Sequence, residues 1–211
     1  LEPSALADAL GGSLRTRMIG EVFAENALAA AAGAIAAGVD AAVVARGIAS
    51  WPVGPGRFEV GTREPALVAV DYAHTPDALA RTCDAARALA GQKRVIVVFG
   101  AGGGADPEKR EPMGRAVGQR ADVAIVTNDN PRREDPRFIA KAVARGAERG
   151  GRAYVLTELD RRAAIRQALE RSKPGDVVVV AGKGHERGQT VGDETLPFSD
   201  VDEVAMLLGG S

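Results

Sequence analysis

Cysteine, histidine and aromatic side chains are scarce in this chain of 211 residues. Cys83 is the only cysteine, which excludes an intrachain disulfide and a cysteine-based zinc site. Its Ala- and Leu-rich surroundings predict a buried helix residue rather than a nucleophile. Because aromatic residues make up only 4%, the core must be built from Ala, Val, Leu and Ile. Two histidines, His74 and His185, are left for acid–base chemistry.

Long apolar runs and an excess of either charge are also missing. No apolar stretch reaches the ~20 residues that a membrane span needs, and the first residues lack the pattern of a signal peptide. The net charge of −1 indicates neither a nucleic-acid partner nor an anionic membrane. Hydrophobic residues make up 45% and charged residues 26%, which is typical of a globular protein. We therefore expect a cytoplasmic protein, of a size that allows one large domain or one domain and part of another.

The chain divides into two regions with different patterns. Ala-rich stretches at 24–37 and 40–49 predict two helices. Residues 51–56 contain two prolines and two glycines and are the expected linker. Beyond it, wholly apolar runs alternate with helical patterns. Strands are expected near 66–71, 94–99, 122–127, 153–156 and 176–181, and helices near 77–90, 112–120, 136–149, 160–171 and 200–208. This alternation predicts an α/β, Rossmann-like domain over 57–211, with a parallel sheet covered on both faces.

Four of the apolar runs end in short loops that carry chemically active side chains. In a parallel sheet, ligands bind beyond the carboxyl ends of the strands, so these loops are expected to meet at one edge. We expect one crevice to contain Asp71, His74, Asn130, Arg132, Lys183, His185 and Glu186. A carboxylate, an amide and a guanidinium in the loop at 129–132 suit a zwitterionic ligand, although the same residues also cap ordinary turns.

Other motifs are weaker. The glycine-rich loop at 100–104 follows a strand, but Ala105 stands at the last glycine of a dinucleotide fingerprint and no acidic residue ends the next strand. No G-x-x-x-x-G-K-[ST] motif occurs, so we expect no ATP hydrolysis from this chain by itself. From the residues alone, an enzyme part, a stand-alone amino-acid or peptide binding module and a nucleotide-binding oxidoreductase all remain open.

Taken in order, the motifs of the chain resemble those of the Mur ligases, and in particular the ligases that add a diamino acid. The resemblance rests on Asn-Ala-Leu-Ala-Ala at 26–30, Gly-Arg-Phe-Glu at 56–59, Asp-Tyr-Ala-His-Thr-Pro-Asp-Ala-Leu at 71–79, Thr-Asn-Asp-Asn-Pro-Arg at 127–132 and Ala-Gly-Lys-Gly-His-Glu at 181–186. It implies an ATP-dependent amide-bond ligase of peptidoglycan synthesis. In such a ligase ATP phosphorylates a carboxylate of a UDP-linked muramoyl peptide, and the amine of an amino acid attacks the acyl phosphate.

The resemblance also implies two sets of binding residues, and none for catalysis or a metal. The nucleotide set is Asn26 at the adenine, Arg57 at the phosphates, and Asp71 and His74 at the ribose and phosphates. The amino-acid set is Asn130, Arg132, Gly182 and Glu186. The Asp-Asn-Pro-Arg sequence implies meso-diaminopimelate, whose distal carboxylate would pair with Arg132 and whose distal ammonium would pair with Glu186. The other substrate implied is UDP-N-acetylmuramoyl-L-Ala-D-Glu.

By the same resemblance, residues 1–52 are the remnant of a central ATP-binding domain and 53–211 are the C-terminal Mur ligase domain. The P-loop, the UDP-sugar domain and most Mg²⁺ ligands are expected upstream of Leu1. Two departures concern binding. Ala105 stands where the family has an arginine, with Lys109 and Arg110 as the nearest replacement cations, and Phe23 stands where an asparagine is usual. The amino-acid substrate therefore stays open at this point.

Overall fold

A computed structural model describes residues 3–63 and 66–209, and the chain forms two compact units, Leu1–Gly54 and Pro55–Ser211. The N-terminal unit is helical. Its helices are α1 (Pro3–Ala9), α2 (Glu21–Ala36) and α3 (Ala41–Ser50). Asp40 begins α3 by accepting hydrogen bonds from the backbone N–H groups of Ala42 and Val43, as N-cap residues do. Both helices expected from the Ala-rich stretches are confirmed, and their proposed origin in an ATP-binding domain stays a prediction.

The second unit, called here the α/β unit, is built on a six-stranded sheet. Its strands are β1 (Glu59–Arg63), β2 (Ala66–Asp71), β3 (Val95–Phe99), β4 (Val123–Val126), β5 (Tyr154–Thr157) and β6 (Val177–Ala181). Their order is β1-β2-β6-β3-β4-β5, and the five strands from β2 to β5 run parallel. The four strands that end in the motif loops are therefore neighbours, which confirms the predicted common sheet.

The five predicted strands form the expected parallel sheet, and a sixth strand that was not predicted joins it at one edge. β1 pairs antiparallel with β2, with Glu59 opposite Val70 and Arg63 opposite Ala66. The sequence of β1, Glu-Val-Gly-Thr-Arg, contains only one strongly apolar residue, so it lacks the signal of a buried strand. Short strands with charged residues are typical of sheet edges, and such a sequence gives no periodic signal of a strand.

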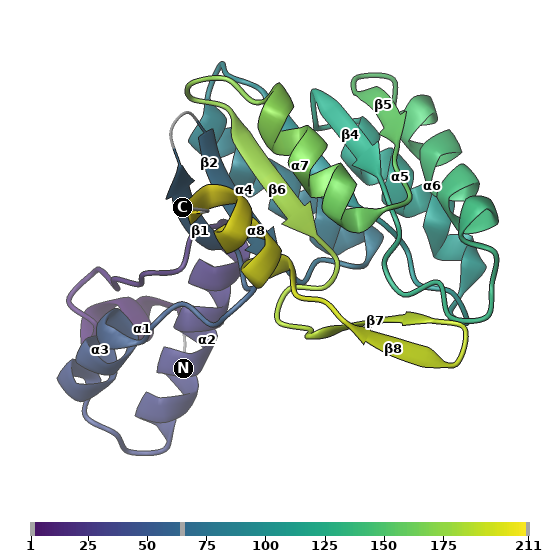
Figure 1. Cartoon of the computed structure of the whole chain (residues 1–211). Coiled ribbons are helices and arrows are strands. Elements are labelled where there is room, and N and C mark those ends of the chain that lie inside the picture. The colour runs from purple at the N-terminus through teal and green to yellow at the C-terminus, as the bar shows by residue number, and fades with distance from the viewer. Residues whose placement is uncertain (1–2, 64–65, 210–211) are drawn as a thin grey trace. The chain divides into compact units, whose positions relative to one another are not determined.

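Helices cover both faces of the sheet (Figure 1). They are α4 (Pro76–Ala90), α5 (Arg110–Gly118), α6 (Pro136–Gly150), α7 (Arg161–Arg171) and α8 (Asp200–Gly209), with a 3₁₀ turn η1 (Pro107–Lys109) before α5. α4, α5 and α6 pack on one face, and α7 and α8 pack on the other. Thr75, Asp135 and Asp160 cap the helices that follow them, and proline opens α4 and α6. The five predicted helices of this region are confirmed.

The core consists of the strands and the helix faces that meet them. Every residue of β3, β4 and β6 is buried, as expected for strands covered on both sides. Cys83 is fully buried in α4, and burial raises the pKa of its thiol to about 12. The thiol is therefore protonated at neutral pH, which confirms the interpretation as a core residue.

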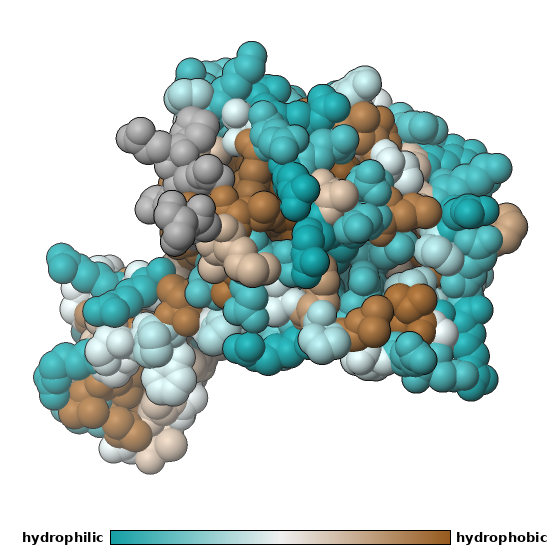
Figure 2. Space-filling view, viewed as in Figure 1, coloured by the Kyte–Doolittle hydropathy of each residue, from teal (hydrophilic) through white to brown (hydrophobic). Residues whose placement is uncertain are grey.

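A two-stranded hairpin follows β6 and was not expected from the sequence. Its strands are β7 (Gly188–Val191) and β8 (Glu194–Pro197), which pair antiparallel, with Thr190 opposite Thr195. Gly192 adopts a φ of 63° in the turn between them, a conformation that favours glycine. Val191 and Leu196 are exposed on the hairpin, where Figure 2 shows hydrophobic surface. No helix in the described ranges is long and apolar enough to cross a membrane.

Asp176 fastens the start of β6 to the start of β3. Its Oδ1 accepts a hydrogen bond from the backbone N–H of Arg94 (3.0 Å), and its Oδ2 accepts from Nη2 of Arg94 (2.6 Å) and from the N–H of Lys173 (2.8 Å). Burial opposes ionisation, but these hydrogen bonds outweigh it and lower the pKa of Asp176 below its ordinary value. The carboxylate form therefore stabilises the fold.

We expect this contribution to disappear in acid. The unfolded chain binds the Asp176 proton more readily than the folded chain, so the free energy of unfolding should be largest above about pH 4 and should fall as the pH drops further. Urea unfolding at a series of pH values measures this slope. Asp176→Asn should flatten it, and an unchanged slope in the variant would contradict the assignment.

Candidate functional site

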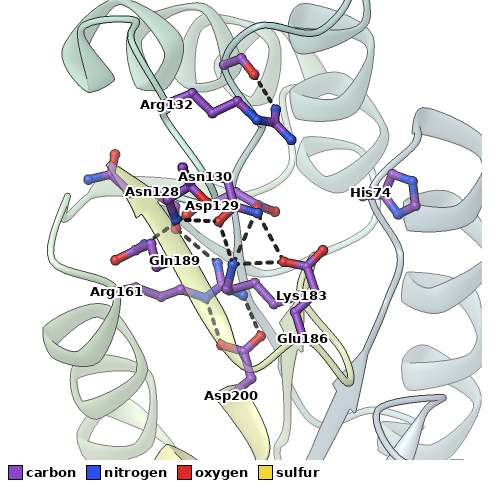
Figure 3. Close-up of polar contacts among 12 residues, drawn as sticks. His74, Asn128, Asp129, Asn130, Arg132, Arg161, Lys183, Glu186, Gln189 and Asp200 are labelled. Carbon is purple, nitrogen blue, oxygen red and sulfur yellow. Dashed lines mark hydrogen bonds and ion pairs between the residues drawn. The ribbon is translucent and has the colours of Figure 1, made fainter. Parts of the chain in front are cut away.

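Four side chains from two loops meet beyond the carboxyl ends of β4 and β6, and we call them the charged cluster: Asp129, Asn130, Lys183 and Glu186 (Figure 3). Asn130 Nδ2 donates to Glu186 Oε2 at 3.0 Å. Lys183 Nζ donates to Asn130 Oδ1 at 2.9 Å and to Glu186 Oε2 at 3.0 Å, and it lies 3.8 Å from Asp129 Oδ1. The predicted meeting of these two loops is confirmed.

Lys183 supplies the positive charge of the cluster from inside the protein. Its side chain is fully buried and lies between two carboxylates, which makes its burial tolerable. Burial opposes ionisation of Glu186, but hydrogen bonds from Asn130 and Lys183 outweigh it and lower the pKa of Glu186. Within the described residues, the hydrogen bonds to Glu186 go to Oε2, and its side chain is 33% exposed. Glu186 is therefore ionised, and among the described residues its Oε1 accepts no hydrogen bond.

Arg161 holds together the loops that follow β4 and β6. Its guanidinium forms a bidentate pair with Asp200, with Nε–Oδ1 and Nη2–Oδ2 distances of 2.7 Å, and both side chains are fully buried. It also donates to the carbonyl of Asn128 at 3.2 Å and to that of Ala181 at 2.9 Å. One side chain thus connects the loops after β4 and β6 to α7 and α8. Sequence reasoning missed this pair because nothing in the local pattern links residues so far apart in the chain.

Gly182 is present at the site because a side chain would not fit there. Its φ is 120°, and a Cβ at this position would lie 2.6 Å from Oδ2 of Asp129. Such a contact would push the Asp129 carboxylate away from Lys183. Glycine is therefore needed here for the packing of Asp129, and the place of Gly182 in the amino-acid set stays a prediction.

Arg132 points away from the charged cluster (Figure 3). It is exposed and donates through Nη1 to the carbonyl of Gly103, so its side chain lies along the glycine-rich loop after β3. The N–H of Gly103 in turn donates to the carbonyl of Asn130 at 2.9 Å. Arg132 and Phe58 are the two non-glycine residues with positive φ in the described ranges. Such conformations persist only where the surroundings hold them, and both lie in loops next to candidate site residues.

A second group gathers beyond β2 and is called here the aromatic cluster: Arg57, Tyr72, His74 and His185. The Arg57 guanidinium lies over the Tyr72 ring at 4.9 Å from its centroid. His74 meets the same ring edge-on at 4.6 Å, and His185 lies tilted against it at 5.0 Å. Nδ1 of His74 is 2.7 Å from the carbonyl oxygen of Tyr72. Arg57 and His74 of the predicted nucleotide set are thus brought together.

Asp71 and Asn26, the other predicted nucleotide residues, have different settings. Asp71 is buried, and its carboxylate accepts hydrogen bonds from the N–H groups of Phe58 (3.2 Å) and Tyr72 (2.9 Å) and from the hydroxyl of Thr82. It therefore anchors the segment that carries Arg57. Asn26 is exposed on α2 in the N-terminal unit.

The single crevice expected from the sequence is in fact two clusters, and Arg132 and the buried Asp71 lie outside both. The loop at 182–186 is shared, since it contributes Lys183 and Glu186 to one cluster and His185 to the other. The split arises because Lys183 draws Glu186 toward Asn130, while the Tyr72 ring takes up both histidines. Among the residues described, no group of three or more His, Cys, Asp or Glu side chains is placed to hold a metal ion.

Comparison with known proteins identifies the fold and its relatives. Residues 56–184 match the family model described as "Mur ligase, glutamate ligase domain". The chain is 45% identical over 189 residues to the UDP-N-acetylmuramoyl-L-alanyl-D-glutamate--2,6-diaminopimelate ligase of Solibacter usitatus, which covers 89% of this chain and 38% of the relative. It is 47% identical over 195 residues to the ligase of the same name from Bradyrhizobium diazoefficiens, covering 90% and 38%.

A solved structure of a ligase with this name superposes with a TM-score of 0.71 at 35% identity, and the match covers 93% of this chain and 40% of that one. The chain thus spans about two fifths of the length of these relatives. The matched residues 56–184 include all six strands of the sheet and most members of both clusters, whereas His185, Glu186 and the β7–β8 hairpin lie beyond them. Because the family model spans the whole six-stranded sheet and the relatives align with about nine tenths of the chain, this chain belongs to the Mur ligase family.

Proposed function

We propose that this chain is the amino-acid-delivering part of an ATP-dependent ligase that adds meso-diaminopimelate to UDP-N-acetylmuramoyl-L-Ala-D-Glu. The observation that carries the proposal is the charged cluster. Its Asn130, Lys183 and Glu186 form one hydrogen-bonded set in a chain 45–47% identical to ligases named for this reaction. In this reaction the γ-phosphoryl group of ATP passes to the substrate carboxylate and ADP leaves. The amine of diaminopimelate then attacks the acyl phosphate, forms the amide bond and displaces inorganic phosphate.

The geometry suits a ligand with charged groups of both signs. Glu186 presents an ionised, partly exposed carboxylate to an ammonium group. Arg132 presents an exposed guanidinium at the glycine-rich loop, where it can form a bidentate pair with a carboxylate. Lys183 donates hydrogen bonds to both Asn130 and Glu186, so these two side chains are oriented before the ligand binds. Such preorganisation lowers the cost of binding.

The aromatic cluster suits the nucleotide. Arg57 and two histidines surround Tyr72, so the cluster combines a guanidinium and two imidazole rings with an aromatic face. Phosphate oxygens are well matched by such donors, and Arg57 is held in place through Asp71 and the N–H of Phe58. We assign ATP to this cluster. The described part of the chain offers no group of three His, Cys, Asp or Glu side chains that would hold Mg²⁺.

A graft tests the function. This chain would replace the matching 38% of the Bradyrhizobium ligase, and ligation would be followed as diaminopimelate-dependent ADP release and product formation. We expect turnover with meso-diaminopimelate and a much higher KM for lysine, which lacks the distal carboxylate. The unaltered relative is the positive control.

Other outcomes of the same assay would point elsewhere. Calorimetric binding of diaminopimelate to the 211-residue chain, combined with an inactive graft that is folded, would favour a binding module without catalysis. Equal use of lysine and diaminopimelate would overturn the assigned substrate. Activity with neither amino acid in a folded graft would overturn the proposed function.

Ala105 allows a separate prediction about diaminopimelate. Arg110, one of its two expected replacements, is buried and paired with both carboxylate oxygens of Glu134 at 2.9 and 2.8 Å. An added cation at position 105 should therefore supply a charge that Arg110 does not. We expect Ala105→Arg to leave the KM for diaminopimelate of the graft unchanged or to lower it. Ala105→Met, of similar length but uncharged, is the control, and a KM raised by arginine but not by methionine would contradict the prediction.

A further inference from the structure

The β7–β8 hairpin lies along the loop at 129–132 and bonds to most of its length. Gln189 Nε2 donates to the carbonyl of Asp129 at 2.8 Å. The N–H of Thr190 donates to Oδ1 of Asn130 at 2.9 Å. The N–H of Arg132 donates to the carbonyl of Thr190 at 3.0 Å. The edge of β7 that faces away from β8 is thus occupied by this loop.

The same edge holds Arg132 in its unusual conformation. The carbonyl of Arg132 accepts from the N–H of Gly192 at 2.7 Å, and Arg132 forms a parallel bridge with Val191. Arg132 has a φ of 53°, a left-handed conformation that a non-glycine residue keeps only with support from its surroundings. Hydrogen bonds on both sides of its peptide supply that support. They direct the side chain toward Gly103 and not toward the charged cluster.

We propose that the β7–β8 hairpin is the element that positions Asn130 and Arg132 for the amino acid, with Thr190 and Gln189 as its positioning residues. Thr190 is central because its N–H and carbonyl bond to two different residues of the loop. If the N–H of Thr190 is removed, Lys183 is the one donor to Asn130 Oδ1 that remains among the described residues. The proposal rests on the proposed function where it concerns substrate use, and on the structure alone where it concerns the loop.

Thr190→Pro removes the key donor and spares the hairpin. The N–H of Thr190 points to the loop, so proline at this edge deletes no hydrogen bond between β7 and β8. Thr195 lies directly opposite Thr190, and in an antiparallel ladder its N–H then also points outward. Thr195→Pro is therefore a matched control. Each variant also loses the 3.0 Å contact between the two threonine hydroxyls. Thr190→Ala keeps the N–H and serves as the conservative variant.

The first measurement is made on the 211-residue chain by hydrogen exchange and NMR. We expect Thr190→Pro to speed exchange of the Arg132 and Gly192 N–H groups and to shift the side-chain amide signals of Asn130. Thr195→Pro and Thr190→Ala should leave these signals as they are. If Thr190→Pro behaves like Thr195→Pro, the hairpin does not hold the loop and the proposal falls.

The second measurement uses the graft. Thr190→Pro should raise the KM for diaminopimelate roughly 10- to 100-fold, the scale of a misplaced binding group, with the KM for ATP unchanged. Thr190→Ala keeps the N–H, so its KM for diaminopimelate should equal that of the unsubstituted graft. An unchanged KM for diaminopimelate in an active graft would overturn the proposal. An inactive, folded parent graft would instead count against the proposed function, and the exchange experiment would still decide the role of the hairpin.

Discussion

Arg161→Met is expected to lower the free energy of unfolding of the α/β unit by about 3–5 kcal/mol, the cost of removing one partner of a buried ion pair. The variant leaves the carboxylate of Asp200 buried without its cation, and the carbonyls of Asn128 and Ala181 lose a donor. Burial disfavours the charged form of Arg161, but Asp200 outweighs it and raises the pKa of the guanidinium, so the pair is ionised. Native-state hydrogen exchange at the amides of β3 and β6 reports the stability of this unit alone.

Two variants make the result specific. Arg133→Met breaks the ion pair with Asp193, whose side chains are 80% and 75% exposed, and it should change stability by no more than about 0.5 kcal/mol. Combining Arg161→Met with Asp200→Leu removes the unpaired charge and should recover much of the loss. If Arg161→Met were as mild as Arg133→Met, the buried pair would not be what holds the loops to α7 and α8.

Arg132→Ala should raise the KM of the grafted ligase for diaminopimelate roughly 10- to 150-fold. This corresponds to about 1.5–3 kcal/mol, the range for a hydrogen bond to a charged group. The guanidinium lies at the glycine-rich loop, where it is exposed and available to the distal carboxylate. The KM for ATP should change little, since the aromatic cluster contains none of the contacts of Arg132. Lysine lacks that carboxylate, so the variant should discriminate less between the two amino acids.

Arg133→Ala is the control for this experiment, because Arg133 is the neighbouring arginine and pairs with Asp193 of the hairpin turn. It should leave the KM for diaminopimelate nearly unchanged. Equal losses of ATP and diaminopimelate affinity in Arg132→Ala would show that the loop at 129–132 is structural, and the amino-acid assignment would be wrong.

The sequence by itself determined the α/β unit and the place of its site. The valine-rich runs of β3 and β6 can be stable only when both faces are covered, so the parallel sheet and its helices follow from local composition. Because parallel strands end at one edge, the neighbourhood of Asn130, Lys183 and Glu186 followed as well. The caps of α4 and α7, Thr75 and Asp160, are also local features, since a cap acts within one turn of its helix.

Only the tertiary structure decided how the side chains at that edge are divided between the charged cluster and the aromatic cluster. The bonds of Lys183 and Glu186 to Asn130, the pairing of Arg161 with Asp200 and the contact of His185 with Tyr72 depend on distances between segments far apart in the chain. The sequence pattern does not predict the hairpin for a related reason. β7 is stabilised by hydrogen bonds to the loop at 129–132 and has no apolar face. Periodicity reports burial of side chains, and it carries no information on which backbone edge a strand will bind.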